Sequence, residues 1–240
     1  MVIVRNLEKK FGNFTAVDRI SFQADKGEIF GLLGENGAGK TTTLRMLATM
    51  LQPTSGQALL DGYDAVKEPE KVRARIGILF GGETGLYDRL TAYENIAYFG
   101  ELNGMGKRDI SERINQLVDA FGMHEFINKR TSKLSKGMRQ KVAFARSIVH
   151  NPDIMLFDEP TSGLDVGAAR EVHEFILGCK AEGKTIIFSS HSMQEVEKLC
   201  DRIGIIHKGK LIETGTVEDL KGKYGDEDLE EIFIRLAGAK

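Results

Sequence analysis

The sequence has little of what marks secreted, disulfide-bonded or membrane-spanning proteins. Only two cysteines, Cys179 and Cys200, occur in 240 residues, which is too few for a disulfide framework or a four-thiolate metal site. The N-terminal apolar stretch is broken at Arg5, and no stretch approaches the roughly 18 apolar residues of a membrane span. We therefore expect a cytoplasmic chain without signal peptide or transmembrane helix, which reaches a membrane only through a partner.

An excess of charge of one sign is also missing. Lys and Arg number 33 and Asp and Glu number 35, which argues against a protein that holds nucleic acid through bulk positive charge. Hydrophobic residues make up 41% and charged residues 28%, which excludes intrinsic disorder and fits one domain with or without an inserted subdomain. The 27 glycines exceed the usual share of about 7% and favour special backbone positions, including phosphate-binding loops.

Short apolar stretches predict a series of strands. These are residues 2–4, 20–24, 28–33, 58–60, 76–80, 154–157 and 185–189, with a hairpin joining 203–207 to 210–212 around Lys208-Gly209. A turn is expected at 9–13. The continuous apolar strand 28–33 leads directly into a glycine-rich segment.

Helical spacing predicts helices between these strands. One covers 41–51, another covers 166–181, and the chain from Tyr87 to about His150 has helical spacing. Strands that alternate with helices predict an α/β fold with a helical insertion. The tail after Gly222 is acidic and then amphipathic, with apolar positions at Leu229, Ile232, Phe233 and Leu236.

The glycine-rich segment carries a phosphate-binding motif. Residues 34–41, here called the phosphate loop, fit G-x-x-x-x-G-K-[ST] between a predicted strand and a predicted helix. Backbone N–H groups would surround a triphosphate, Lys40 would reach its β- and γ-phosphates, and the Thr41 hydroxyl would bind Mg²⁺. A glycine-rich strand-to-helix turn without ligand is the alternative.

Two further strands end in polar residues that suit the same chemistry. Strand 154–157 leads into Asp158, placed to hold Mg²⁺, and Glu159, placed to polarise a water for attack on the γ-phosphate. Strand 185–189 leads to His191, which we interpret as a γ-phosphate contact. The alternatives are a solvated turn for the acidic pair and a structural role for a lone histidine.

A second candidate anion site lies at residues 134–138, Leu-Ser-Lys-Gly-Met, here called the signature segment. Ser135 is a good helix N-cap, and Met138, Val142, Ala145 and Val149 mark the buried face of the helix that follows. A serine, a glycine N–H and a helix N-terminus can together bind an anion, although an ordinary helix start has the same pattern. With the phosphate loop and the acidic pair, this segment resembles the signature of ABC transporter ATP-binding subunits, usually Leu-Ser-Gly-Gly-Gln.

The resemblance covers residues 1 to 216, with every motif in order. It implies a P-loop NTPase core of the ABC ATPase type, an N-terminal antiparallel β subdomain and an inserted helical subdomain at about 87–150. It also implies one domain at 1–222 with a short tail at 223–240. Phe11 resembles the aromatic residue that stacks on adenine, and Asp165 lies in a loop resembling the one that links two sites across a dimer. The ATP-binding residues implied by it are Phe11, Gly34, Glu35, Asn36, Gly37, Ala38, Gly39, Lys40, Thr41, Thr42, Ser135, Gly137 and Asp165.

The resemblance further implies roles and partners. ATP and Mg²⁺ are the cofactors, Thr41 and Asp158 bind the metal, and Glu159, His191 and Lys40 are the catalytic residues. A second ATPase subunit, identical or related, would use Ser135 and Gly137 to cap the ATP held by the first. An integral-membrane permease would hold the pair on the cytoplasmic face of the membrane, docking near 81–90 and the helical segment. Leu86 and Tyr87 are candidate exposed apolar contacts, and the alternative is that they are buried core residues.

One departure from the family pattern lies after the strand ending at Phe80. The family usually has a glutamine there, whereas this chain reads Gly81-Gly82-Glu83-Thr84. Glu83 is the candidate substitute, and the alternative is that a water fills the role. This glycine-rich segment, with 85–95 and the Lys-Gly-Met signature, is similar to bacterial sodium-exporting ABC ATPases of the NatA type. We expect an ATPase that powers Na⁺ efflux. The alternatives are a drug exporter, a soluble ABC ATPase acting on nucleic acid or ribosomes, and a regulatory ATPase.

Overall fold

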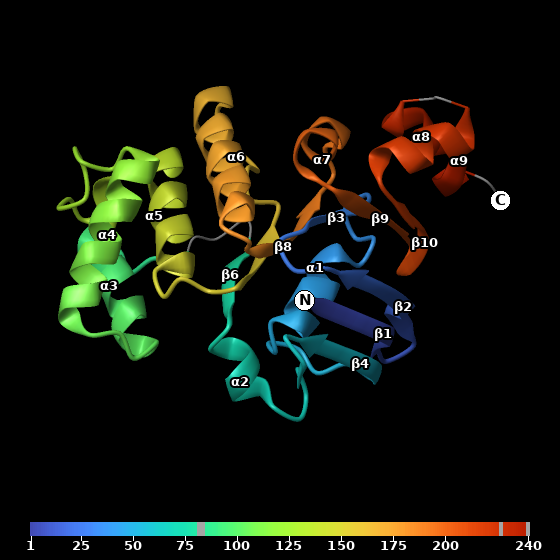
Figure 1. Ribbon diagram of the computed structural model, residues 1–240, viewed down its shortest axis with the longest axis horizontal. Coiled ribbons are helices and arrows are strands. Elements are labelled where there is room, and N and C mark those ends of the chain that lie inside the picture. The colour runs from blue at the N-terminus through green and yellow to red at the C-terminus, as the bar shows by residue number, and fades with distance from the viewer. Residues whose placement is uncertain (81–84, 226–227, 239–240) are drawn as a thin grey trace.

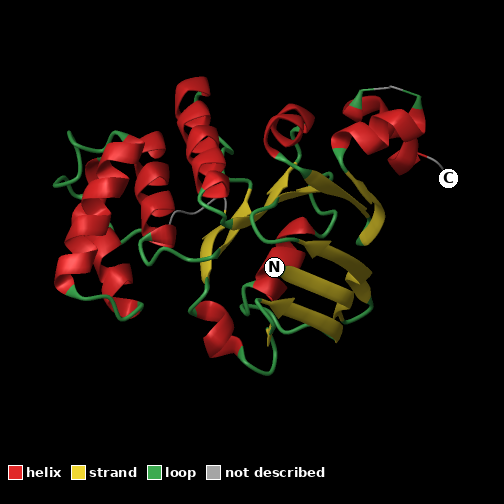
Figure 2. Ribbon diagram, in the orientation of Figure 1, coloured by secondary structure: helices red, strands yellow, loops and turns green. Residues whose placement is uncertain are grey.

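Two β-sheets and a group of helices make up the molecule, shown by a computed structural model that describes residues 1–80, 85–225 and 228–238 (Figures 1 and 2). The antiparallel sheet has the order β2-β1-β4-β5. The larger, mixed sheet has the order β10-β9-β3-β8-β7-β6. The strands of the antiparallel sheet are β1 (Val2–Phe11), β2 (Phe14–Ala24), β4 (Ser55–Leu60) and β5 (Tyr63–Asp64). Those of the mixed sheet are β3 (Ile29–Leu33), β6 (Ile76–Phe80), β7 (Ile154–Asp158), β8 (Thr185–Ser190), β9 (Arg202–His207) and β10 (Lys210–Gly215).

The mixed sheet brings distant segments to one edge. Strands β3, β6, β7, β8 and β9 run parallel, and only β10 pairs antiparallel, with β9. Leu33 lies opposite Ser190, and Asp158 lies opposite Ser189. The carboxyl ends of parallel strands meet at one edge of a sheet. This edge therefore brings together the phosphate loop, the acidic pair (Asp158 and Glu159) and the end of β8 before His191.

Helices cover the mixed sheet and form the expected insertion. The helices of the core are α1 (Lys40–Leu47), α2 (Pro69–Arg73), α6 (Val166–Ala181) and α7 (Met193–Leu199). Those of the insertion are α3 (Ala92–Leu102), α4 (Lys107–Phe121) and α5 (Lys136–Ile148), which lie at one side of the molecule with the antiparallel sheet at the other (Figure 1). A short 3₁₀ helix at Thr131–Lys133 precedes α5. Of the helices in the described part of the chain, none combines the length and the apolar character needed to cross a bilayer.

The alternating faces of β3 divide the apolar interior in two. Ile29 and Leu33 belong to a core shared with α3 to α7, whereas Phe30 and Leu32 belong to one shared with α1 and the antiparallel sheet. All five residues of β3 are buried. This strand therefore holds the phosphate loop on a base packed from both sides.

Two local predictions are wrong, and one open alternative is decided. The turn expected at 9–13 is limited to Gly12 and Asn13, because β1 continues to Phe11, which pairs with Phe14. The helix expected at 41–51 begins at Lys40 and ends at Leu47, since Thr49 has the positive φ of 60° that ends helical continuity. Leu86, named as a candidate exposed contact with a buried core position as the alternative, is 8% exposed and packs in the core with α3 and α4, as in the alternative.

The C-terminal segment forms two helices that pack against the domain. These are α8 (Val217–Tyr224), which runs across the expected boundary at 222, and α9 (Leu229–Gly238). Leu229 and Phe233 of α9 lie in the same core as Val196 and Leu199 of α7. The amphipathic pattern of the tail thus buries its apolar face on the core.

Candidate active site

Glycines shape the phosphate loop between β3 and α1. Gly39 is the N-cap of α1 with φ 112°, and a Cβ there would lie 2.6 Å from the carbonyl oxygen of Ala16. At Gly34, a Cβ would lie 2.3 Å from the carbonyl oxygen of Ile206. Both positions therefore require glycine, and Gly39 has no side chain that could occupy the amides at the helix start. These amides are suited to bind a phosphate.

Lys40 is buried inside the phosphate loop. Its Nζ donates to the carbonyl oxygens of Gly34 (2.6 Å) and Glu35 (3.0 Å) and lies 3.8 Å from Oε1 of Glu159. Burial lowers the pKa of the Lys40 ammonium, and the carboxylates of Glu159 and Asp158 oppose this. The carboxylates therefore favour a charged lysine where phosphates would bind.

The oxygens of Thr41 and Asp158 lie together at the end of β7. Thr41 Oγ1 donates to Oδ2 of Asp158 at 2.8 Å, and Ser189 Oγ donates to Oδ1 at 2.5 Å. Asp158 is 6% exposed. Carboxylate and hydroxyl oxygens are the donors that Mg²⁺ takes, through one or two carboxylates plus phosphates rather than a full protein cage. In the described residues no group of three or more His, Cys, Asp or Glu is placed to hold a metal ion.

Glu159 lies beside both Lys40 and His191. Glu159 has φ 48°, unusual for a residue other than glycine, and its N–H donates to the carbonyl oxygen and to Oγ of Ser189 at 3.1 Å each. The Glu159 carboxylate approaches His191, whose Nδ1 lies 3.1 Å from Oε1. His191 is exposed, so its ring is accessible to a ligand.

Phe11 lies at the exposed end of the β1–β2 hairpin. Its ring is 50% exposed, and Lys9 Nζ lies 5.0 Å from the ring centre. Phe14, which pairs with it across the turn, is 64% exposed.

The signature segment and Asp165 both begin helices. Ser135 Oγ accepts from the N–H of Met138 at 3.3 Å, and Asp165 Oδ1 accepts from the N–H of Ala168 at 2.9 Å. In the part of the chain that the structure describes, no hydrogen bond or ion pair joins Ser135, Gly137 or Asp165 to residues 34–42. The structure thus brings Lys40, Thr41, Asp158, Glu159 and His191 together, and leaves these three residues exposed or half-buried elsewhere. Glu83 lies outside the described residues.

Several contacts around the site were not predicted from the sequence. Ser189 binds Asp158, Gln140 Nε2 of α5 donates to the carbonyl oxygen of Pro160 at 3.2 Å, and Glu195 contacts both loops that carry the site. Ser189 is the next-to-last residue of β8 and pairs with Asp158 of β7, so its position one residue before the predicted Ser-His pair was the available signal. The contacts of Gln140 and Glu195 depend on tertiary packing.

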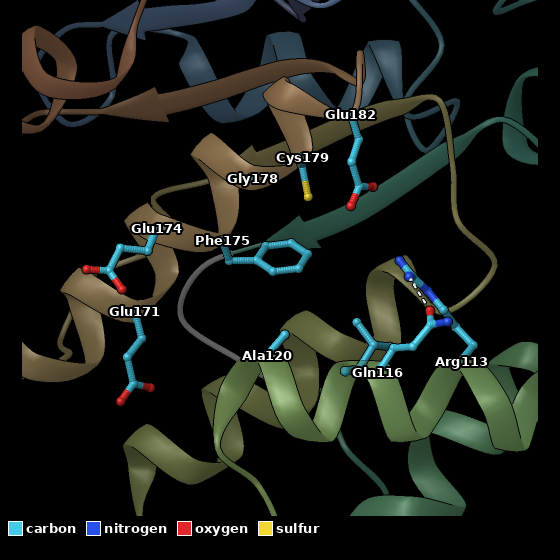
Figure 3. Close-up of a pocket in the computed structure, with 10 residues that line it drawn as sticks. Arg113, Gln116, Ala120, Glu171, Glu174, Phe175, Gly178, Cys179 and Glu182 are labelled. Carbon is cyan, nitrogen blue, oxygen red and sulfur yellow. Dashed lines mark hydrogen bonds between the residues drawn. The ribbon is translucent and has the colours of Figure 1, made fainter.

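A groove of about 610 Å³ lies between α4 and α6, lined by Arg113, Phe175, Cys179 and several glutamates (Figure 3). Glu171 pairs with Lys141, and Glu174 pairs with Arg170. Burial raises the pKa of the Cys179 thiol to about 12, so it is no nucleophile near neutral pH. The phosphate loop and the acidic pair contribute no lining residue, so this groove is separate from the candidate active site.

Comparison with known proteins identifies the family of the chain. The sequence model of the family described as "ABC transporter" matches residues 17–162, and one described as "AAA domain, putative AbiEii toxin, Type IV TA system" matches 128–197. The chain is 52% identical to the ABC transporter ATP-binding protein NatA of Bacillus subtilis, covering 96% of this chain and 94% of that protein. It is 36% identical to the daunorubicin/doxorubicin resistance ATP-binding protein DrrA of Streptomyces peucetius, covering 91% and 66%.

Solved structures similar to this chain point to the same family. An ATP-binding subunit of an ABC transporter superposes with a TM-score of 0.91 at 28% identity, covering 98% of this chain and 99% of that one. A dimeric ATP-binding cassette in a post-hydrolysis state with ADP and phosphate superposes with a TM-score of 0.82 at 26% identity, covering 90% and 98%. The resemblance found in the motifs and the expected fold are confirmed, and the chain belongs to the ABC transporter family as an ATP-hydrolysing, ATP-binding subunit.

Proposed function

We propose that this chain powers a membrane exporter by hydrolysing ATP at the edge of the mixed sheet. The observation that carries the proposal is the convergence of Lys40, Thr41, Asp158, Glu159 and His191 around the phosphate loop. Each group suits one part of phosphoryl transfer, in which catalysis is mainly positioning and charge stabilisation.

Each residue of the candidate site has its own role in ATP binding or hydrolysis. Lys40 and the amides of residues 34–42 hold the phosphates, and the exposed ring of Phe11 stacks on adenine. Thr41 and Asp158 hold Mg²⁺, which supplies positive charge to the phosphate oxygens. Glu159 accepts a proton from, or orients, the attacking water, and His191 contacts the γ-phosphate. Their separation of 3.1 Å allows both to act on the same group.

A second ATPase subunit completes the site in this proposal. Within the described residues, no hydrogen bond or ion pair joins Ser135, Gly137 or Asp165 to residues 34–42 of their own chain, and Ser135 and Asp165 are exposed. They are thus available to the phosphate loop of a partner, and the dimeric cassette that superposes on this chain supports such an arrangement. Closure of the dimer on ATP and its opening after hydrolysis supply the movement.

The membrane partner docks on a patch formed by Tyr87, Tyr98 and Leu102, which are 49%, 39% and 61% exposed. The rings of Tyr87 and Tyr98 lie 5.5 Å apart, edge to face. Tyr87 is held firmly, because its N–H donates to Oδ1 of Asn95 and its carbonyl oxygen accepts from Nδ2 of Asn95 and Oγ1 of Thr131. A fixed loop that presents exposed aromatic rings is suited to receive a helix of a permease.

The transported solute is Na⁺ in this proposal. Its support is the resemblance of residues 85–95 and the signature segment to sodium-exporting ATPases, together with 52% identity to the protein named NatA. The relative named for daunorubicin and doxorubicin resistance favours drug export as the second candidate. The ATPase subunit does not contact the solute, so its own site does not separate the two.

The test begins with mild-detergent purification of the tagged chain from its native membranes. A stoichiometric partner with apolar spans supports the exporter assignment, and recovery with only soluble proteins or RNA overturns it. The complex is then reconstituted in vesicles, and ATP-dependent transport of Na⁺ and of daunorubicin is measured. Transport of Na⁺ alone supports sodium export, and transport of the drug alone overturns it.

A further inference from the structure

Glu195 of α7 occupies a buried position between the two loops that carry the catalytic residues. Its side chain is 7% exposed. Oε1 accepts from Oγ1 of Thr161 at 2.6 Å and lies 3.0 Å from Nε2 of His173, and Oε2 accepts from Oγ of Ser190 at 2.6 Å. A buried carboxylate is costly unless its oxygens are satisfied, and three partners satisfy these.

The partners of Glu195 belong to different loops. Thr161 follows Glu159 by two residues, and its carbonyl oxygen accepts from the N–H of Leu164, next to Asp165. Ser190 directly precedes His191, and its Oγ also accepts from the N–H of Ser192 at 3.0 Å. The two loops are thus joined at two places. Glu159 contacts His191, and Glu195 accepts hydrogen bonds from both Thr161 and Ser190.

His173 adds a third element to this cluster. It comes from α6, and its side chain is 14% exposed. Burial opposes ionisation of Glu195, but the hydrogen bonds from His173, Ser190 and Thr161 outweigh it, so the pKa of this carboxyl is below its usual value. Glu195 is therefore a charged acceptor whose two oxygens join β8, α6 and the loop after β7.

We propose that Glu195 is a positioning residue that fixes the distance between Glu159 and His191 by tying Thr161 and Ser190 together. The inference rests on the catalytic roles proposed above for Glu159 and His191. Glu195 also links the loop that contains Asp165 to the loop that contains His191 within one chain. A shift of the first loop therefore moves the second. Loss of the Glu195 hydrogen bonds leaves the phosphate loop and Lys40 in place. It therefore lowers the rate of ATP hydrolysis and leaves the affinity for MgATP unchanged.

The first experiment replaces Glu195 by Gln in the full chain as isolated from its membranes. We expect kcat to fall about 10- to 100-fold, the size of effect expected when reacting groups are misplaced by about 1 Å. The dissociation constant of MgATP, measured by equilibrium dialysis, stays within about twofold of wild type. The control is Glu197→Gln on the same helix, because Glu197 pairs with Lys221 of α8, whereas Thr161 and Ser190 bond to Glu195. This control retains wild-type turnover.

A double-mutant cycle separates positioning from general destabilisation. If Glu195 acts through His191, Glu195→Gln reduces kcat by less than about threefold when added to His191→Ala. An equal loss in both backgrounds, parallel losses of kcat and MgATP binding, or wild-type turnover in Glu195→Gln overturns the inference. If Glu195→Gln fails to fold, Thr161→Val and Ser190→Ala are used instead. Each keeps the Glu195 carboxylate and removes one of its hydrogen bonds. Each lowers kcat if the inference is right.

The same set of variants distinguishes this inference from the proposed function. If Glu159→Gln and His191→Ala hydrolyse ATP at the wild-type rate, the proposed catalytic roles fail. If both lose turnover while Glu195→Gln, Thr161→Val and Ser190→Ala do not, only the positioning role fails.

Discussion

Oγ1 of Thr41 donates a hydrogen bond of 2.8 Å to Oδ2 of Asp158, although 117 residues separate them in the chain. The two lie at the ends of different elements, the first turn of α1 and the last residue of β7. Since the sheet places β8 between β3 and β7, the contact spans two strand pairings. It provides two of the oxygens that the proposed Mg²⁺ site needs.

The first prediction concerns this pair. Asp158→Asn keeps the shape of the side chain but removes its charge, and we expect the Mg²⁺ concentration for half-maximal ATPase activity to rise by at least about tenfold, because hard cations favour carboxylate ligands. A magnesium titration of steady-state hydrolysis measures it. An unchanged Mg²⁺ dependence would show that Asp158 does not contribute to the metal site.

The second prediction concerns Glu159. Glu159→Gln still binds MgATP, but hydrolyses it about 10²- to 10⁴-fold more slowly, the usual contribution of a positioned base. The variant accumulates as a closed dimer in the presence of ATP, which size-exclusion chromatography detects. Turnover at the wild-type rate would remove Glu159 from the catalytic role.

The third prediction concerns the backbone of the phosphate loop. Gly39→Ala puts a Cβ 2.6 Å from a backbone oxygen at φ 112°, and we expect the free energy of unfolding to fall by about 2 kcal/mol or more. The control is Gly178→Ala in α6, where nothing lies within 4 Å of the added Cβ and the change raises stability by roughly 0.5–1 kcal/mol. Urea unfolding measures both. Equal effects of the two substitutions would contradict the argument.

The fourth prediction concerns pH and His150. Burial lowers the pKa of His150 below the ordinary 6.5, and Arg113 and Lys184 add to this, while the carbonyl oxygen of Ile76 opposes it. The unfolded chain therefore takes up a proton at this position before the folded one does, so stability falls as pH drops below 6.5 toward the folded pKa. His150→Gln cannot take up that proton. The free energy of unfolding should therefore change less between pH 7.5 and pH 5.5 in this variant than in wild type. An equal or larger change would exclude His150 as a cause of the pH dependence of stability.

The fifth prediction concerns the permease patch. Tyr87→Ala and Tyr98→Ala should weaken recovery of the membrane partner by about tenfold or more, since truncation of a central aromatic contact typically costs 2 kcal/mol or more. Dissociation of MgATP should not change. Leu177→Ala is the matched control, because Leu177 is an exposed apolar residue on α6, away from the patch. Full recovery of the partner with both tyrosine variants would place docking elsewhere.

Much of the fold was predictable because its signals are local. The strand 154–157, the helix 166–181 and the hairpin around Lys208-Gly209 agree with the structure to within a few residues. Their apolar periodicity and turn residues are properties of short segments. The differences at Leu47, Phe11 and Leu86 arose where a positive φ, a strand pairing or a packed helix overrides the local pattern.

The sequence by itself pointed to the residues proposed to carry the chemistry, because a phosphate loop needs glycine, lysine and threonine at fixed spacing and the acidic pair follows an apolar strand. Only the tertiary structure decided which of these residues meet. The parallel register of β3, β8 and β7 places Lys40 beside Glu159, and the packing of α7 places Glu195 under both catalytic loops. Strand order and helix packing depend on contacts between segments far apart in the chain, and no local pattern encodes them.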